Sequence, residues 1–507
     1  MSMDTIKTSA DRFRPYTSEE TFSRIVCDAT LTAMWQRCKN AYANDTALVF
    51  DGQSMTYAGL DGAASRVRSA VVKSGCLPSD RVAILCENSI DFAALLLGAV
   101  TAGCTAVVLP AHLKEDAVFG CVMTFGCKAL LTQDCMREKC RLLQEKRPDL
   151  PILFPGEEKT HGDVPAVEVS PDDPCVIIFT GGSTGKSKGA LLSHRAVMQG
   201  VINSCYGIKE VFGQRYILAL PLSHVFGLIR NLLFCLYSNS TLMISKSRQA
   251  LFSDIASFQP TVLVLVPALA EMALALSKKF QRNMLGDSLH TIISGAAPVP
   301  QYLVEQYNEM GIGLFPGYGL TESANLVSGN PIPLQKPGSV GIPYPNQELR
   351  LVDGELWLRG DNMLTCYVGS GEAAYTQDGW FRTGDLVTVD EDGFLYITGR
   401  IKEVIILDNA ENIYPAELEA KFNELPFVRD SLVSEAIAEN GKHILELEVV
   451  LRESEIPSLG DQPKQTATEK LWEVNRRQPP SHQVSRIVIR EEDFERLPSM
   501  KIVRHKL

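Results

Sequence analysis

The sequence predicts an α/β protein with a large N-terminal domain of helix-covered, mainly parallel sheets and a small antiparallel β-barrel, followed by a small α+β domain. Three patterns along the 507 residues carry this prediction. Short apolar runs first alternate with amphipathic stretches, as in parallel sheets covered by helices. From about residue 338, strands punctuated by glycine and proline indicate antiparallel sheet. Past Gly399-Arg400 the pattern is mixed, so we place the domains at residues 1–399 and 400–507.

The individual elements follow from local composition. Runs of β-branched and aliphatic residues predict strands, and longer amphipathic stretches predict helices. In the first part, strands are expected at residues 81–85, 176–179, 216–220, 262–266 and 291–293, with helices at 268–278 and 299–309. Further along, the expected elements are strands at 347–352, 354–359, 386–389 and 394–397, a helix at 415–423, strands at 431–436 and 443–451, and a helix at 468–476.

The uncharged stretch from residue 92 to residue 109 is long enough to raise the question of a membrane span. Asn88-Ser89 can cap a helix that Gly103 ends, and residues 104–110 then have the composition of a strand. We therefore expect a helix and a strand here, and no membrane span.

Composition narrows the classes of function. With 45% hydrophobic and 21% charged residues, the chain has the make-up of a soluble globular protein. A net charge of -11 argues against nucleic acid and anionic membranes as partners, because both require a basic surface. The 13 cysteines are scattered and include no Cys-x-x-Cys pair, and residues 1–20 lack the apolar core of a signal peptide. These features favour a cytoplasmic location.

The stretch Thr180-Gly181-Gly182-Ser183-Thr184-Gly185-Lys186-Ser187-Lys188-Gly189 follows the predicted strand at 176–179. Its glycines allow backbone N–H groups to approach a phosphate, its hydroxyls donate hydrogen bonds and its lysines supply charge. A Walker A loop would need glycine where Thr180 stands, and it would run straight into a helix, whereas residues 189–192 intervene before the expected N-cap Ser193. The pattern alone leaves a phosphate-binding loop and a surface turn as open alternatives.

Two later motifs carry residue types suited to a nucleotide. In Phe315-Pro316-Gly317-Tyr318-Gly319-Leu320-Thr321-Glu322-Ser323, an aromatic ring can stack on a base, a hydroxyl can bond phosphate and a carboxylate can hold Mg²⁺. In residues 378–386, the carboxylate of Asp385 can accept hydrogen bonds from two vicinal hydroxyls, as on a ribose. A packed tyrosine and a hairpin-turn aspartate are the alternative interpretations.

Together these stretches resemble the adenylate-forming superfamily of acyl-CoA synthetases, adenylation domains and luciferases, and they are most similar to AMP-forming acyl-CoA synthetases. The resemblance rests on residues 179–189, 317–323, 379–386 and 399–419 in this order, strengthened by residues 221–227 and 354–360. It extends over nearly the whole chain. It implies that the small C-terminal domain is mobile about a hinge at residues 400–402, with Lys402 at the pivot.

The resemblance also implies roles for single residues. Thr321 and Glu322 would serve the α-phosphate, and Glu322 would also hold the Mg²⁺ ion. His224 resembles a histidine at the mouth of the acyl pocket. The residues that would hold ATP are Thr180, Gly181, Gly182, Ser183, Thr184, Gly185, Lys188, Gly295, Ala296, Ala297, Tyr318, Asp385 and Arg400.

The expected catalytic lysine lies near the C-terminus. Lys501 stands in the family's lysine position because it follows Pro498-Ser499 and one further residue. Met500 replaces a usual glycine there, and Lys506 is the competing candidate.

The implied activity is that of an ATP-dependent carboxylate–CoA ligase, of the kind found in fatty acid metabolism. It would form an acyl-adenylate and pyrophosphate, and then an acyl-CoA thioester and AMP, with ATP, Mg²⁺ and coenzyme A. No aspartate that could hold an α-ammonium group lies between Pro221 and Arg230, so the expected substrate is a small carboxylic acid without one. Ala410 replaces a usual glycine in the stretch expected to line the thiol channel.

Three alternatives stay open. A ligase that loads a carrier-protein thiol would share every motif, and a non-catalytic acyl- or nucleotide-binding relative would fit the departures at Ala410 and Met500. A P-loop NTPase is disfavoured by the spacing of the glycine-rich loop. The sequence does not indicate the chain length of the acid or the oligomeric state.

Overall fold

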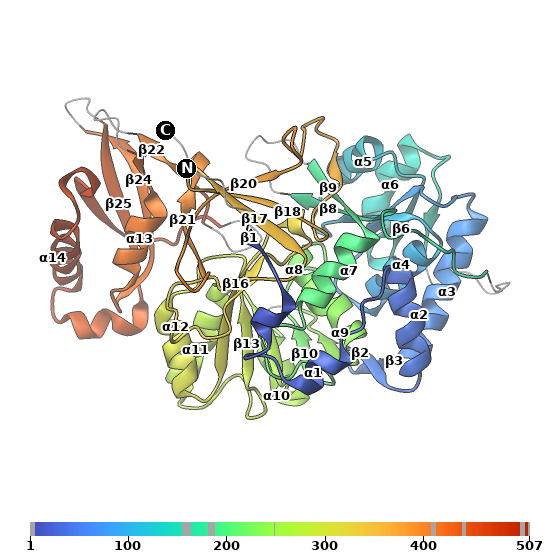
Figure 1. The fold of residues 1–507 in the computed structure, drawn as a ribbon, viewed down its shortest axis with the longest axis horizontal. Coiled ribbons are helices and arrows are strands. Elements are labelled where there is room, and N and C mark those ends of the chain that lie inside the picture. Colours follow the sequence, from blue (N-terminus) through green and yellow to red (C-terminus); the bar gives the residue numbers. More distant parts are fainter. Residues whose placement is uncertain are drawn as a thin grey trace.

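The computed structural model describes residues 6–154, 164–180, 188–247, 249–406, 412–438, 443–496 and 502–504. Figure 1 shows a large N-terminal part built on three sheets and, at the left end of the view, a smaller C-terminal part with its own sheet. The α/β class predicted from the sequence is confirmed. The domain boundary at residues 399–402 and the mobility of the smaller part stay predictions.

The largest sheet has nine strands and is parallel from β2 to β14. Its order is β16 (Ile342–Pro343), β15 (Ser328–Gly329), β14 (Gly313–Tyr318), β13 (Thr291–Ser294), β12 (Val262–Leu265), β10 (Arg215–Leu218), β11 (Thr241–Ile244), β2 (Thr46–Phe50) and β3 (Gln53–Thr56). Parallel neighbours need a crossover, which is supplied here by α10 (Leu251–Phe258), α11 (Pro267–Phe280) and α12 (Gln301–Glu309). The predicted strands and helices of this region are present, and the end of β14 includes residues 315–318 of the motif at 315–323.

A second sheet has seven strands. Its order is β19 (Cys366–Val368), β9 (Lys188–Ser193), β8 (Pro174–Thr180), β5 (Thr105–Leu109), β4 (Arg81–Leu85), β6 (Ala129–Thr132) and β7 (Ile152–Leu153). Strands β8 and β9 form an antiparallel hairpin, so the glycine-rich loop joins two strands and does not lead into a helix. This connection differs from that of a Walker A loop.

Both faces of the second sheet are buried. In β4, Val82 and Ile84 belong to the large core shared with the nine-stranded sheet, whereas Ala83 and Leu85 belong to a smaller core on the other face. Successive side chains of a strand point to opposite faces, so continuous apolar strands such as 81–85 and 105–109 are what a sheet covered on both sides requires. The helices around this sheet are α3 (Tyr57–Lys73), α4 (Ile90–Thr101), α5 (Glu115–Thr124) and α6 (Arg137–Lys146).

Two helices begin where their capping residues predict. The Ser89 hydroxyl accepts a hydrogen bond from the Phe92 N–H at the start of α4, and Ser193 does the same for Ala196 at the start of α7 (His194–Asn203). The stretch from residue 92 to residue 109 is thus the helix and strand that we predicted. Among the described residues, no helix is both long and apolar enough to cross a membrane.

An antiparallel sheet of five strands follows, as predicted for the region after residue 338. Its order is β1 (Ile6–Lys7), β17 (Gln347–Val352), β18 (Glu355–Gly360), β20 (Phe381–Val389) and β21 (Leu395–Arg400). Strand β20 begins before its predicted start and places Asp385 within the strand, not in a turn. Closure of this sheet into a barrel stays a prediction.

The C-terminal part has a sheet and a core of its own. The sheet consists of β24 (Val428–Ile437), β25 (His443–Leu451) and β26 (Arg486–Arg490), and the helices are α13 (Pro415–Asn423) and α14 (Pro463–Arg476). A separate apolar cluster includes Leu418, Phe422, Leu447 and Leu471. The predicted α+β composition is confirmed, with β26 as an additional strand parallel to β25.

The remaining elements are short or lie between the sheets. They are η1 (Ala10–Phe13), α1 (Glu19–Arg24), α2 (Leu31–Ala41), η2 (Asp134–Met136), α8 (Val225–Gly227), η3 (Leu228–Leu233), α9 (Phe234–Tyr237), η4 (Thr321–Ser323), η5 (Ile401–Glu403), β22 (Ile405–Ile406), β23 (Asn412–Ile413), η6 (Glu453–Leu459) and η7 (Pro480–His482).

Candidate functional site

A cavity of about 1530 Å³ lies at the meeting point of the three large sheets and the C-terminal part. Strand ends of the nine-stranded sheet, the start of the β8–β9 hairpin and residues of β24 all contribute to its wall. The predicted site residues that line it are Thr180, Lys188, His224, Gly295, Ala296, Tyr318, Thr321, Glu322, Arg400 and Lys402. Gly181, Gly182, Ser183, Thr184, Gly185 and Lys501 lie outside the described residues, as do Ala410 and Met500.

Tyr318, Asp385 and Arg400 form one connected group. The Tyr318 hydroxyl donates to Asp385 Oδ2 at 2.5 Å, and Arg400 Nε lies 2.7 Å from Asp385 Oδ1. Strands β20 and β21 pair Asp385 directly with Arg400, and the Thr383 hydroxyl accepts from the Asp385 N–H at 3.0 Å. Burial and the neighbouring carboxylate raise the pKa of Tyr318 well above its ordinary value, so its hydroxyl stays protonated and donates.

Each oxygen of the Asp385 carboxylate can accept more than one hydrogen bond. The carboxylate therefore keeps acceptor capacity while Tyr318 and Arg400 hold its orientation. This is the donor–acceptor arrangement that a pair of vicinal hydroxyls requires. Asp385 itself is buried and stands just behind the cavity wall that Tyr318, Thr383, Gly384 and Arg400 form.

The segment after β13 makes a tight turn against β14. Ala296 has φ 65°, which is unusual for a residue other than glycine, and Gly295 lies directly against the backbone of Gly317. A Cβ atom at Gly295 would stand 2.9 Å from the Gly317 carbonyl oxygen, so the close approach requires glycine. The turn brings Gly295 and Ala296 to the cavity, whereas Ala297 is not among the lining residues.

Thr321 and Glu322 occupy the short helix η4 immediately after the β14 strand end. The Tyr367 hydroxyl donates to Glu322 Oε1 at 2.7 Å. Burial and the Glu322 charge raise the pKa of Tyr367, so this hydroxyl too remains a donor. No group of three or more potential metal-ligating side chains is present among the described residues, and Glu322 is the carboxylate available beside Thr321.

Lys188 is held at the mouth of the β8–β9 hairpin. Its Nζ lies 2.9 Å from Glu372 Oε2 and 3.9 Å from the centre of the Tyr367 ring. The lysine holds the pKa of the Glu372 carboxyl below its usual value. Tyr367 thus joins Lys188 and Glu322 across the cavity. Sequence reasoning missed Tyr367 and Glu372 because they lie far along the chain from Lys188, and no local motif marks them.

His224 precedes α8 and lines the cavity beside Val225 and Phe226. Burial, and secondarily the nearby His112, lower the pKa of His224 below 6.5. The imidazole is therefore neutral at pH 7. A neutral ring among apolar neighbours suits the wall of a pocket for an organic acid better than it suits a charged anchor.

The C-terminal part closes the cavity through an arginine near the end of the chain. Arg504 Nη1 lies 2.8 Å from Glu419 Oε1 on α13, and Arg504 Nε lies 3.4 Å from Glu403 Oε2 in η5. Arg504 and Lys402 both line the cavity. The predicted catalytic Lys501 precedes Arg504 by three residues in the sequence, and its role stays a prediction.

Comparisons with known proteins identify the family. The family model described as AMP-binding enzyme matches residues 35–368. The chain is 31% identical to an indoleacetate–CoA ligase of Aromatoleum aromaticum, over 76% of this chain and 81% of the relative. It is 29% identical to a long-chain-fatty-acid–CoA ligase of Escherichia coli O157:H7, over 94% of each chain.

Solved structures show the same fold. The anthranilate CoA ligase AuaEII in complex with anthranoyl-AMP superimposes with a TM-score of 0.82 at 21% identity, covering 98% of this chain and 97% of that one. The o-succinylbenzoate CoA synthetase of Bacillus subtilis, solved with ATP and magnesium, gives a TM-score of 0.77 at 24% identity, covering 92% and 98%. The resemblance inferred from the motifs is confirmed: the chain belongs to the AMP-binding enzyme family.

Proposed function

We propose that this chain is an ATP-dependent carboxylate–CoA ligase that forms an acyl-adenylate and pyrophosphate, and then an acyl-CoA thioester and AMP. The observation that carries the proposal is the convergence of Tyr318, Asp385 and Arg400 with Thr321 and Glu322 on one cavity. Relatives named as CoA ligases over most of their length support the same activity.

In this proposal, the residues at the strand ends position ATP. Asp385 accepts from the ribose hydroxyls, Tyr318 and the Gly295-Ala296 turn flank the base, and Lys188 and the 180–185 loop meet the phosphates. Mg²⁺, when bound beside Glu322, neutralises phosphate charge. The attacking carboxylate is already an anion, so the chain's work is to orient it and to stabilise negative charge that develops on the phosphoryl oxygens.

Without a nucleotide, Lys188 forms an ion pair with Glu372, and this ion pair must break before Lys188 can bind a phosphate. Lys188 can exchange the Glu372 carboxylate for a more highly charged phosphate. This exchange needs no large side-chain movement, because Glu372 lies next to the ends of β8 and β9. The Tyr367 ring, 3.9 Å from Nζ, holds the ammonium group in place during the exchange.

Acid-dependent exchange of labelled pyrophosphate into ATP tests the first half-reaction, and a thioester assay tests the second. Coenzyme A is the proposed thiol, a carboxylic acid the proposed substrate and the cytoplasm the proposed location. Thioester formed only with an acyl-carrier protein would identify a carrier-protein ligase. Exchange absent with every acid would identify a non-catalytic binding protein.

A further inference from the structure

We propose that the acid activated by this chain carries a second anionic group, most simply a second carboxylate, and that Arg230 binds it. The inference rests on the proposed function and names its substrate class. The observation behind the proposal is that Arg230 is buried and has no carboxylate partner. It lines the same cavity as His224.

Arg230 is only 3% exposed, yet it is one of the lining residues of the cavity. Its Nη1 atom lacks a well-aligned hydrogen-bond partner, and the group beside it is the protonated hydroxyl of Tyr216, which carries no counter-charge. Among the described residues, no carboxylate forms an ion pair with Arg230. Its guanidinium lies 4.6 Å from the centre of the Phe234 ring, which is a weak substitute for a counter-charge. Burying an unpaired cation costs several kcal/mol, so a compensating ligand is expected.

The other arginine side chains of the wall each form an ion pair. Arg382 pairs with Glu355, Arg400 with Asp385, and Arg504 with Glu419. The carboxylates that line the cavity are likewise engaged elsewhere, and their partners are Tyr367 for Glu322, Arg382 for Glu355, Lys188 for Glu372, Arg504 for Glu403 and His443 for Glu435. None of these carboxylates forms an ion pair with Arg230.

Two further buried polar atoms of the same wall lack protein partners. They are the Ser294 hydroxyl, at the end of β13, and Asn325 Nδ2, which follows η4. A pocket built for a plain hydrocarbon chain would leave these groups and Arg230 unsatisfied, and each unsatisfied group has a cost. A substrate with polar groups can satisfy such positions, whereas a hydrocarbon chain cannot.

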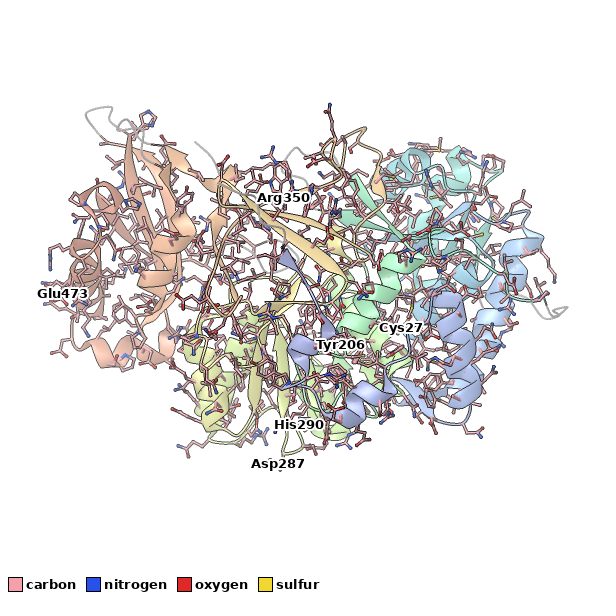
Figure 2. The ribbon with its side chains drawn as sticks, viewed as in Figure 1. Cys27, Tyr206, Asp287, His290, Arg350 and Glu473 are labelled. Carbon is pink, nitrogen blue, oxygen red and sulfur yellow. The ribbon has the colours of Figure 1, made fainter. Side chains whose placement is uncertain are left out.

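The local backbone geometry is a second, independent reason to place Arg230 in a functional site. Arg230 lies in η3 (Leu228–Leu233), a π-helical turn between α8 and α9. Such turns are uncommon, cost helical regularity and occur frequently at functional sites. Tyr206 also lines the cavity, and Figure 2 shows it in the large N-terminal part, remote from Glu473 in the C-terminal part. Arg230 belongs to the same large part, because η3 lies between α8 and α9.

The test compares acids that differ only in the second charge. Adipate and isophthalate are paired with 6-methylheptanoate and 3-isopropylbenzoate, in which an isopropyl group replaces one carboxylate. We expect acid-dependent ATP–pyrophosphate exchange with kcat/KM at least about 100-fold higher for the charged member of at least one pair, the ratio typical of a buried charge pair. Arg230→Met should abolish that ratio by lowering kcat/KM for the diacid only, and Arg230→Lys should restore part of it.

Arg195, which pairs with Asp172 outside the cavity, provides the matched control, and Arg195→Met should keep the wild-type ratio. Thermal unfolding gives a readout that is independent of turnover. Adipate or isophthalate should raise the Tm of the wild type and not that of Arg230→Met, while Arg230→Met without ligand should be at least as stable as the wild type because an unpaired charge is removed.

The outcomes separate the two proposals. Exchange with the apolar acids at equal or higher kcat/KM would overturn the second-carboxylate inference and leave the ligase function standing. Exchange absent with all acids would overturn the ligase function. In that case the Tm shifts decide whether Arg230 binds dianionic acids, and the lack of a shift would overturn that inference as well.

Discussion

Asp385 receives hydrogen bonds from both Tyr318 and Arg400, so its charge is the centre of the proposed ribose site. We expect Asp385→Asn to lower kcat/KM for ATP by about 10- to 100-fold, since bonds to a charged acceptor are lost. Tyr318→Phe keeps the ring and removes only one donor, and so should cost about tenfold or less. Steady-state kinetics at varied ATP measures both variants. Equal losses in the two variants would contradict a role centred on the carboxylate.

Lys501 is the residue proposed to stabilise charge on the transferring phosphoryl group. Deleting one such donor should lower the adenylation rate by about 10²- to 10³-fold. Pyrophosphate exchange by Lys501→Ala measures this, and Lys506→Ala is the matched control that should exchange normally. If Lys506→Ala loses exchange and Lys501→Ala keeps it, the two assignments are reversed.

At the residue scale, the sequence predicted the groups that carry recognisable motifs and missed their partners. Tyr318, Glu322 and Asp385 stand in motifs, whereas Tyr367 reaches the site through the pairing of β19 with β9, and Glu372 follows that strand. Arg230 gave one usable signal, a charge inside the apolar run from residue 225 to residue 236. Its burial and its lack of a carboxylate partner depend on tertiary packing, which the sequence does not reveal.

His194 at the start of α7 links that helix to α2. Its Nδ1 accepts a hydrogen bond from the Leu31 N–H at 3.2 Å, and burial lowers its pKa from 6.5 to about 4. The neutral ring is therefore the folded form. Because the folded-state pKa is depressed, this contribution to stability is full above pH 6.5 and is lost as the pH falls toward 4.

The matching variant is His194→Asn, which supplies an acceptor near the Nδ1 position and does not titrate. Between pH 7 and pH 4 the wild type should lose about 3 kcal/mol more unfolding free energy than the variant does. Urea unfolding at several pH values measures the difference, and the variant cancels the background of other titrating groups. Parallel pH profiles would contradict a neutral buried His194.

At the element scale, local signals predicted where helices begin. The partners of the strands could not be predicted from local composition. Ser89 and Ser193 marked the starts of α4 and α7 because a cap acts within one helical turn. Residues 189–192 were read as a connection before the helix, yet they form β9, since a hairpin partner is decided by β8 and not by local composition. Residues 315–318 of the motif at 315–323 likewise form the end of β14, because they pair with β13 and β15.

At the scale of the whole molecule, the C-terminal part contacts the large N-terminal part through two arginines. Arg504 lines the cavity, and Lys501 precedes it closely in the chain. Arg452 of the C-terminal part contacts Glu271 on α11, with Arg452 Nε 3.1 Å from Glu271 Oε1. Figure 1 shows this part beside α11 and α12. The described contacts of Arg504 and Arg452 thus join the C-terminal part to the cavity wall and to α11.

A proline at the hinge should separate the two half-reactions. Lys402 lies in the first turn of η5, where proline is tolerated, and proline then restricts φ for any other arrangement. We expect Lys402→Pro to keep pyrophosphate exchange within about threefold and to slow thioester formation by more than about 100-fold. Lys402→Ala is the control and should affect neither step strongly. Equal slowing of both steps would show that residue 402 is not a pivot between them.

The domain order along the chain was predictable because each part has its own pattern of strands and helices. The relative placement of the parts was not, since it depends on contacts such as the one between Arg452 and Glu271, which are distant in sequence. The same limit applies to the cavity, whose wall is assembled from both parts.

Acid-dependent ATP–pyrophosphate exchange tests the central claim most directly. Purified full-length protein with MgATP, labelled pyrophosphate and a panel of mono- and dicarboxylic acids should incorporate label into ATP only when an accepted acid is present, and Asp385→Asn and Lys501→Ala should reduce that incorporation. Label that enters ATP equally without acid, or release of orthophosphate in place of pyrophosphate, would contradict an adenylating carboxylate ligase.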